Sequence, residues 1–138
     1  MLEMAREVCK KAHAGQVDKA GADYYLHPFA VADMCKTEEE KIVALLHDVV
    51  EDTDVTLKDL AGLGFSQKIL DAIGALTHAS NEDYFDYIAR VKKNKLATAV
   101  KINDLTHNSD LSRLINITPK DMARVEKYSR CIAILRTV

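Results

Sequence analysis

Apolar residues recur along this chain at the spacing of one face of an α-helix, and this pattern constrains its fold most. Four stretches between residues 2 and 91 carry apolar side chains three and four positions apart. The stripes are Leu2, Ala5, Cys9 and Ala12; Ile42, Leu45, Leu46 and Val49; Ile69, Leu70, Ile73 and Leu76; and Tyr84, Tyr87, Ile88 and Val91. No segment alternates apolar and polar residues convincingly, as a half-buried strand would. The sequence therefore predicts an all-α fold of about six to eight helices.

Residues that cap helix N-termini precede several of these stripes. Thr37 is followed by three glutamates, which is the pattern of a capping box. Thr118 precedes Pro119, and proline favours the first helical position. Thr56 and Ser66 are weaker candidates for caps. The residues from Gly15 to Leu26 include two glycines among mixed polar residues and predict a loop.

The last predicted helix also carries an apolar stripe. Its members are Met122, Val125, Tyr128, Ile132 and Leu135. Such a stripe can face the core or a second copy of the chain. We expect this stripe to face the core, and a homo-oligomer remains an alternative that the sequence leaves open.

Length and composition limit the class of protein. The chain has 138 residues, of which 48% are hydrophobic, and its net charge of −2 comes from 19 basic and 21 acidic residues. This length suits one domain, so we expect residues 1–138 to fold together. The hydrophobic content argues against disorder. The near-neutral charge argues against a nucleic-acid polymer as partner.

Other features concern the cellular compartment. No apolar run approaches the roughly 18–20 residues of a membrane span. Residues 1–7 mix acidic and basic side chains, unlike a signal peptide. Cys9, Cys35 and Cys131 are widely spaced, which favours reduced, buried thiols. We therefore expect a cytoplasmic protein.

Residues 42–52 divide into an apolar and a charged side when they are wound as a helix. His47, Asp48, Glu51 and Asp52 span about 140° of its circumference, and apolar residues fill the rest. No lysine or arginine lies between residues 42 and 54. Crowded carboxylates repel one another unless a cation offsets them. This run alone fits either a metal site or an acidic, solvent-exposed face.

A second polar face is predicted on residues 96–108. Lys101, Asp104 and Asn108 cluster on the side opposite Ala99. Taken alone, this is an amphipathic helix with a solvent-exposed polar face. His27, which precedes Pro28, is on its own compatible with an ordinary surface or core histidine.

Together, however, these residues form a set of metal-ligand types. The set is His27, His47, Asp48 and Asp104. Two imidazoles and two carboxylates suit a divalent ion such as manganese or iron. A structural zinc site would more often use cysteines.

The chain resembles the HD-domain metal-dependent phosphohydrolases. It is most similar to the alarmone hydrolase domain of RelA/SpoT-type enzymes and their small stand-alone relatives. That family carries a motif like AHxGQxRKxGxPYIxHPxxVA, which residues 12–32 match in part, and ALLHDVVEDT, which residues 44–53 match completely. Residues 76–78 match a leucine, threonine and basic residue, and residues 101–108 are similar to KLADRLHN. The resemblance covers roughly residues 5–110.

The resemblance implies a role for each matching residue. The implied metal ligands are His27, His47, Asp48 and Asp104. The implied catalytic residues, which position and activate the attacking water, are Glu51 and Asp52. The implied substrate-binding residues are Lys19, Tyr24, Thr77 and Asn108. His13 is expected to support the site without binding the metal.

The activity that the resemblance implies is hydrolysis of the 3′-diphosphate of guanosine tetra- or pentaphosphate. The products would be pyrophosphate and GDP or GTP. The divalent cofactor would be Mn²⁺, and the partner a small-molecule nucleotide of the stringent response. The fold would be a compact HD-domain helical bundle.

Three residues depart from the family pattern. Asp18 stands where the family has an arginine that packs on the guanine base, Leu105 replaces another arginine, and Asp23 replaces a proline. A carboxylate cannot provide the stacking contact of a guanidinium. Two alternatives therefore stay open: an HD phosphohydrolase for another nucleotide phosphate, and a catalytically silent nucleotide-binding module. The retained carboxylate pair argues against the second.

Overall fold

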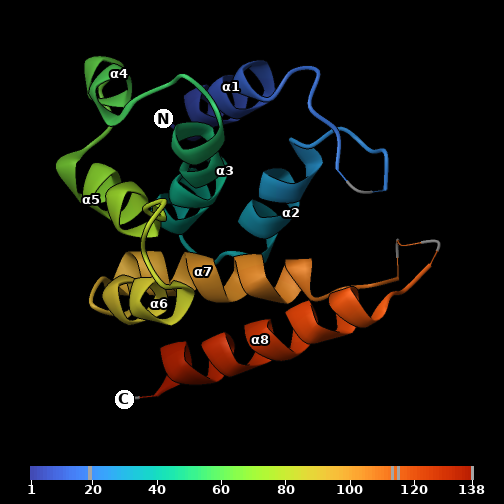
Figure 1. Cartoon of the computed structure of the whole chain (residues 1–138). Helices are drawn as coiled ribbons and strands as arrows, with labels where there is room; N and C mark the ends of the chain where they lie inside the picture. Colours follow the sequence, from blue (N-terminus) through green and yellow to red (C-terminus); the bar gives the residue numbers. More distant parts are fainter. Residues whose placement is uncertain (19, 113, 115, 138) are drawn as a thin grey trace.

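The computed structural model describes residues 1–18, 20–112, 114 and 116–137, and this part of the chain contains eight helices (Figure 1). They are α1 (Leu2–Ala12), α2 (Leu26–Met34), α3 (Glu38–Asp52), α4 (Leu57–Gly62), α5 (Gln67–Leu76), α6 (Tyr84–Lys92), α7 (Lys95–Asn108) and α8 (Pro119–Arg136). Among the described residues, the β-structure is limited to an isolated bridge between Val17 and Asp23. The prediction of an all-α fold with six to eight helices is confirmed.

Helix α3 packs against four other helices. It contacts α1, α2, α5 and α7 and lies between them (Figure 1). Every residue from Ile42 to Val49 is buried, so the helix is covered on its polar side as well as its apolar side. His47 and Asp48 are consequently held inside the protein. The alternative of an acidic, solvent-exposed face is wrong for these two residues.

The polar face of α7 is also buried. The helix packs against α2 and α3 on one side and α8 on another. It buries Lys101 and Asp104 together with Val100 and Leu105, whereas Ile102 is only partly covered. The expectation of a solvent-exposed face for Lys101 and Asp104 is therefore wrong. Periodicity separates the two faces of a helix but does not say which neighbours will cover the polar one.

Helix α8 runs beside α7 along one side of the molecule (Figure 1). The second half of α8 contributes Cys131 and Leu135 to the core. The core position of Leu135 agrees with the apolar stripe predicted for this helix. Met122 is 57% exposed, so the prediction of a core position is wrong there. The first turns of α8 instead border the pocket described below.

Side-chain caps begin several helices where the sequence predicted them. Thr118 and Asp121 form a reciprocal capping box, and so do Thr56 and Asp59. The Thr37 side chain accepts a hydrogen bond from the Glu40 amide, but the Glu40 carboxylate turns to the amide of Lys36. A cap of this kind stabilises a helix by about 1 kcal/mol.

The segment before α2 is a folded loop, as predicted. Gly15 and Gly21 both have φ of 85°, a backbone conformation that other residues rarely adopt. The chain doubles back in this loop, and the Tyr24 amide donates a hydrogen bond to the Gln16 carbonyl at 2.8 Å. The loop thereby delivers Tyr24 and then His27 to the end of α3.

Two further expectations concern cysteines and membranes. The three cysteines are free and buried, as predicted. Within the described residues, no helix combines the length and the apolarity that crossing a membrane requires.

Candidate metal centre and adjoining pocket

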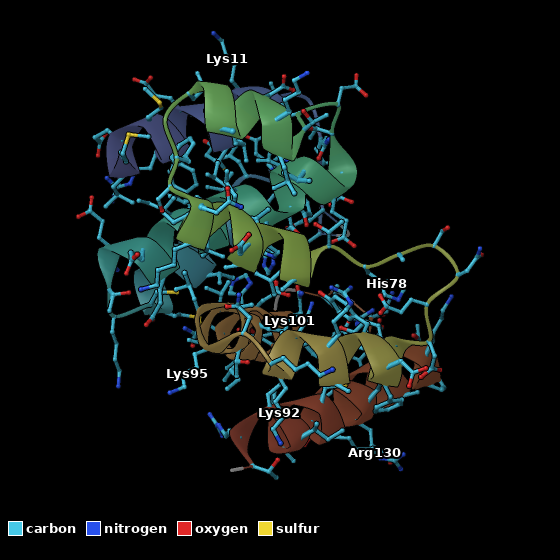
Figure 2. All side chains as sticks on the ribbon, turned by 90° about the vertical axis from the view of Figure 1, so that its left-hand side faces the viewer. Lys11, His78, Lys92, Lys95, Lys101 and Arg130 are labelled. Carbon is cyan, nitrogen blue, oxygen red and sulfur yellow. The ribbon has the colours of Figure 1, made fainter. Side chains whose placement is uncertain are left out.

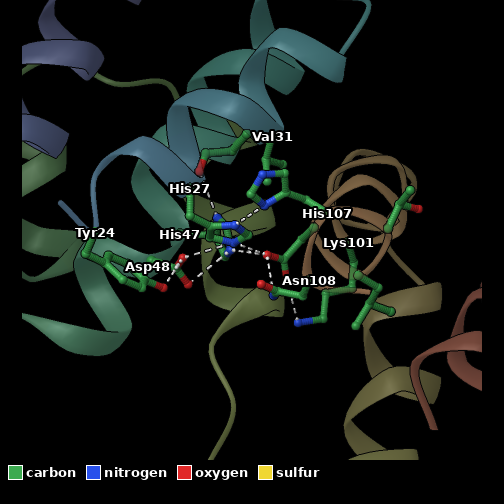
Figure 3. A network of polar contacts seen from close by, with 12 residues as sticks. Tyr24, His27, Val31, His47, Asp48, Lys101, His107 and Asn108 are labelled. Carbon is green, nitrogen blue, oxygen red and sulfur yellow. Dashed lines mark hydrogen bonds and ion pairs between the residues drawn. The ribbon is translucent and has the colours of Figure 1, made fainter. Parts of the chain in front are cut away.

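Four predicted metal ligands converge from three helices, and Figure 3 labels His27, His47 and Asp48 among them. His27 comes from α2, His47 and Asp48 from α3, and Asp104 from α7, and all four are at most 8% exposed. His27, Asp48 and Asp104 offer ligand atoms that lie within 4.8 Å of one another. Residues up to 77 positions apart thus form one buried cluster of nitrogen and oxygen donors.

The His47 side chain tests whether a cation fits this cluster. Its Nδ1 lies 2.9 Å from the Ala44 carbonyl, which requires a proton on that nitrogen. In the neutral imidazole Nε2 then carries the lone pair. Nε2 makes no hydrogen bond within the described part of the chain. Oxygens of Asp48 and Asp104 lie 3.2 and 3.9 Å away. A buried lone pair facing two carboxylates is suited to a shared metal ion.

Tyr24, Lys101 and Asn108 hold the two carboxylates in place. The Tyr24 hydroxyl donates to Asp48 Oδ2 at 2.9 Å, and Lys101 Nζ donates to Asp104 Oδ2 at 3.0 Å. Asn108 Nδ2 approaches Asp104 Oδ1 at 3.4 Å. Asp48 Oδ1 faces His47 at 3.2 Å, and Asp104 Oδ1, which Asn108 also contacts, faces His27 at 2.7 Å. Partners of this kind orient metal ligands and raise metal affinity.

His27 contacts a second histidine that the sequence analysis did not single out. Its Nε2 lies 2.7 Å from Asp104 Oδ1, and its Nδ1 lies 2.7 Å from Nδ1 of His107. For Nε2 to bind a metal, Nδ1 must carry the proton and donate it to His107. Burial lowers the pKa of His27, but its hydrogen bond to Asp104 and the nearby carboxylates outweigh this effect and raise it.

Lys101 is a buried cation inside this network. In Figure 2, Lys11 and Arg130 reach outward, whereas Lys101 lies among the helices. Its Nζ lies 5.2 Å from the centre of the Tyr87 ring and 5.9 Å from that of Tyr84. Burial disfavours its charge, but Asp104 raises the pKa of Lys101 well above its usual value. Lys101 in turn lowers the pKa of Asp104 against the effect of burial.

Glu51 and Asp52 lie at the C-terminal end of α3, one turn beyond His47 and Asp48. Both are solvent-exposed, unlike the four buried ligands. Partial desolvation and the charge of Asp48 raise the pKa of each carboxyl. A carboxylate with a raised pKa is a better proton acceptor near neutral pH.

A cavity of about 400 Å³ opens beside the cluster. Its lining includes His27, His107 and Asn108, and it continues along the loop before α2 and onto α8. The other lining residues are Val17, Asp18, Ala20, Tyr24, Asp110, Leu114, Arg124 and Tyr128. The cavity connects the candidate metal centre to a space with the size of a small-molecule site.

The predicted substrate-binding residues are placed differently. Tyr24 and Asn108 line the cavity and also contact the carboxylates of the cluster. Thr77 does not line it; it follows α5, and its hydroxyl donates to the Ile73 carbonyl at 3.0 Å. Lys19 lies outside the described residues.

The residues that depart from the family pattern have clear positions. Asp18 lines the cavity, and its Oδ1 accepts hydrogen bonds from the amides of Ala20 and Ala22 at 2.9 and 3.0 Å. Leu105 is 1% exposed, so it belongs to the core. His13 is buried beside Tyr24, with ring centres 4.9 Å apart, and it is not among the clustered ligand groups.

Arg124 and Tyr128 are pocket residues that sequence reasoning missed. The apolar stripe of the last helix predicts a core position for Tyr128, and Arg124 lies beyond the family motifs. The contact of His107 with His27 spans 80 residues, so the sequence around His107 does not indicate it. Nothing local in the sequence signals these three roles.

Comparison with known proteins yielded several relatives, although no family model matches the chain. The bifunctional (p)ppGpp synthase/hydrolase SpoT of Escherichia coli K12 is 28% identical over 141 residues, covering 91% of this chain and 20% of that protein. The guanosine-3′,5′-bis(diphosphate) 3′-pyrophosphohydrolase of Haemophilus influenzae is 30% identical, covering 87% of this chain and 20% of that protein. The corresponding Vibrio cholerae protein is 32% identical, with coverages of 78% and 17%.

A solved structure, described as a metazoan ortholog of SpoT that hydrolyses ppGpp, superposes with a TM-score of 0.80. It is 20% identical, and the match covers 98% of this chain and 85% of that one. The resemblance predicted from the motifs is confirmed. The structural match establishes the helical fold. The chain spans about one fifth of the length of the bacterial relatives it matches.

Proposed function

We propose that this protein is a metal-dependent phosphohydrolase that removes the 3′-diphosphate of guanosine tetra- or pentaphosphate. Water would supply the oxygen and protons, and the products would be pyrophosphate and GDP or GTP. The observation that carries the proposal is the buried convergence of His27, His47, Asp48 and Asp104 beside the exposed carboxylates of Glu51 and Asp52. The names of the bacterial relatives support the substrate.

The four buried ligands would hold one divalent cation, and we propose Mn²⁺. Two imidazoles and two carboxylates, without a cysteine, suit manganese better than a structural zinc. When bound, such an ion polarises a phosphoryl oxygen and lowers the pKa of bound water toward ~7. The ligands themselves are held by Tyr24, Lys101 and His107 at the distances given above.

Glu51 and Asp52 would position the attacking water and accept its proton. Their raised pKa values support this role, since a proton acceptor works best when its pKa lies nearer the working pH. Tyr24 and Asn108 would contact the nucleotide in the adjoining cavity. The family resemblance assigns Lys19 to the phosphates and Thr77 to the pocket wall.

A second candidate function is hydrolysis of a different nucleotide phosphate. The position of Asp18 in the cavity lining favours it. A carboxylate there cannot stack on guanine as the family arginine does, and it repels phosphate.

Pyrophosphate release from guanosine tetraphosphate by metal-stripped protein, with and without Mn²⁺, tests the proposal. We expect release only with Mn²⁺, and none from an Asp48→Ala variant. The Glu51→Gln variant should bind Mn²⁺ like the wild type but lose turnover by about 10²-fold or more. Release of pyrophosphate without any metal would contradict the metal assignment. Mn²⁺ binding without release would favour another nucleotide, to be sought among adenosine and pyrimidine phosphates.

A further inference from the structure

His13 is a buried histidine that the proposed function does not use. It is 1% exposed and follows the last residue of α1. Its Nδ1 lies 2.9 Å from the side-chain oxygen of Gln16, which places the ring proton on Nδ1 and leaves a lone pair on Nε2 of the neutral imidazole. Nε2 is buried and makes no hydrogen bond within the described part of the chain. A buried acceptor without a donor is costly, so a partner for this atom is expected.

The loop before α2 fixes the orientation of this imidazole. Gln16 accepts a hydrogen bond from the Tyr24 amide at 2.8 Å through its backbone carbonyl, and its side chain contacts His13. The ring centres of His13 and Tyr24 lie 4.9 Å apart. The Tyr24 hydroxyl in turn donates to Asp48 Oδ2 at 2.9 Å, and Figure 3 shows the two side chains side by side. His13 is therefore one ring removed from the candidate metal centre.

Helix α1 brings His13 close to Asp52 at the end of α3. The two helices pack together. Burial raises the pKa of the Cys9 thiol to about 12, and the nearby charge of Asp48 adds to this rise. His13 and Asp52 each lie four residues, or one helical turn, beyond that pair. Desolvation and the charge of Asp48 raise the pKa of Asp52, and positive charge on His13 lowers it, so His13 lies within electrostatic reach of that carboxyl.

The titratable groups that act on Asp52 come from three segments. They are Asp48, Glu51 and His47 on its own helix, His13 at the end of α1, and Tyr24 in the loop before α2. The Tyr24 hydroxyl is engaged by Asp48, and His47 Nε2 faces Asp48 and Asp104. Nε2 of His13 is thus a buried acceptor near Asp52 that the candidate metal centre does not engage.

The chemistry of the proposed function supplies the proton that a contact between these two groups needs. An ionised Asp52 and the lone pair on His13 Nε2 are both acceptors, so they form no hydrogen bond with each other. When Asp52 accepts a proton from the attacking water, its carboxyl O–H becomes a donor, and the hydroxide oxygen is left to attack phosphorus. Asp52 is exposed, so its side chain can turn that O–H toward the imidazole. A hydrogen bond to the protonated form favours it over the carboxylate.

We propose that His13 is a positioning residue whose Nε2 accepts a hydrogen bond from Asp52 once Asp52 has taken up the proton of the attacking water. His13 takes up no proton itself and acts on the reaction through Asp52. The inference rests on the proposed function. It gives the proton-accepting role to Asp52 and leaves Glu51 to position the water.

Two amide substitutions separate the two nitrogens of the His13 ring. In His13→Gln the side-chain amide reaches the position of Nε2, whereas in His13→Asn it reaches only that of Nδ1 and keeps the contact with Gln16. Lys11→Gln is the control on α1, because Lys11 is exposed and reaches outward (Figure 2). Carboxyl-carbon NMR of the metal-free protein measures the pKa of Asp52, whose signal is identified by its loss in Asp52→Asn. The kcat and KM values are measured with guanosine tetraphosphate and Mn²⁺.

We expect His13→Asn to lower the pKa of Asp52 by about one pH unit and kcat by about tenfold, the scale of one hydrogen bond, with KM nearly unchanged. His13→Gln should restore most of both values, since its amide oxygen can accept from Asp52. Lys11→Gln should behave as the wild type. A role of His13 in packing alone does not lower the pKa of Asp52, because loss of an imidazole that can carry positive charge raises it.

A pKa of Asp52 that rises or stays constant in His13→Asn overturns the inference, and so does a His13→Gln variant that behaves like His13→Asn. Nitrogen-15 spectra of the wild-type imidazole are a check that needs no variant to fold. In the neutral ring of His13, a proton on Nε2 contradicts the proposal and a proton on Nδ1 supports it. If the wild type releases no pyrophosphate, the proposed function fails, while the pKa values of Asp52 still decide the contact with His13.

Discussion

Lys101 is a charged side chain that is 8% exposed and lies against the carboxylate of Asp104, a proposed metal ligand. Desolvating a lysine is costly, and here Asp104 and two tyrosine rings offset that cost. The residue is better understood as a positioning group than as a surface cation, because its hydrogen bond fixes Asp104 Oδ2 and leaves Oδ1 for His27. Its effect on the site passes through Asp104.

Replacing Lys101 by methionine should destabilise the metal-free protein by about 3 kcal/mol, since the buried Asp104 carboxylate would lose its lysine partner and keep only its contacts with histidines and Asn108. Added Mn²⁺ should recover part of that loss, because the cation would compensate Asp104. Urea unfolding with and without Mn²⁺ measures both effects. Lys95→Met is the control, since Lys95 is on the same helix and exposed. Equal destabilisation of the two variants would refute this role.

Asp18 is the departure with the clearest consequence for substrate choice. Its carboxylate lines the pocket while accepting two backbone hydrogen bonds. We expect Asp18→Arg to tighten guanine nucleotide binding about tenfold through stacking and charge. Asp18→Asn, which keeps the acceptor oxygen, separates loss of charge from gain of stacking. Calorimetric titration with GDP measures both; weaker binding by Asp18→Arg would place the base elsewhere.

At the scale of elements, a clamp between α5 and α6 holds the segment that joins them. Arg90 donates to the carbonyls of Ala75 and Thr77 and pairs with Glu82 at 2.9 Å. Hydrogen bonding to Arg90 lowers the pKa of Glu82 to about 2, and this effect outweighs desolvation, which acts in the opposite direction. The clamp keeps Tyr84, at the start of α6, beside Lys101.

The lowered pKa of Glu82 predicts how stability depends on pH. Since the folded value lies below the ordinary 4.5, the contribution is complete above pH 4.5 and is lost as the pH falls toward 2. Glu82→Gln should therefore be less stable than wild type at pH 7 and equally stable near pH 2. Urea unfolding across this range measures the difference. The effect should vanish in an Arg90→Gln background, and a difference that persists at pH 2 would contradict it.

On the scale of the whole molecule, the proposed metal centre joins helices from distant parts of the chain. His27, His47 and Asp104 come from α2, α3 and α7, and the unfolded chain cannot hold them together. A cation that binds the assembled ligands therefore stabilises the fold by mass action. The two helices that supply His47, Asp48 and Asp104 are also central to the packing, since α3 contacts four other helices and α7 contacts five.

Mn²⁺ at about 100 times its dissociation constant should stabilise the protein by about 2.7 kcal/mol, roughly 8 °C in Tm for a chain of this size. Differential scanning calorimetry across a Mn²⁺ series measures the shift. Asp48→Ala should lose it, and Glu51→Gln should keep it because Glu51 is outside the ligand cluster. An undiminished shift in Asp48→Ala would place the ion elsewhere.

Local pattern was enough to predict the helices and the types of ligand. Thr56 and Thr118 cap helices because their side chains reach amides three residues away. The sequence spacing of His47, Asp48 and Glu51 places them on the same side of α3, because the position of a residue around a helix depends only on its spacing along the chain. The shared ligand types, and then the family resemblance at residues 12–32, 44–53 and 101–108, linked that side to His27 and Asp104.

Packing between distant segments was needed for the rest. Periodicity placed Lys101 and Asp104 on one face of α7, but the residues that cover that face come from α2, α3 and α6. The same reason applies to the His27–His107 contact across 80 residues and to the place of Arg124 and Tyr128 in the pocket. A residue's spacing along the chain encodes its helix face, whereas its neighbours depend on which helices the fold brings against that face.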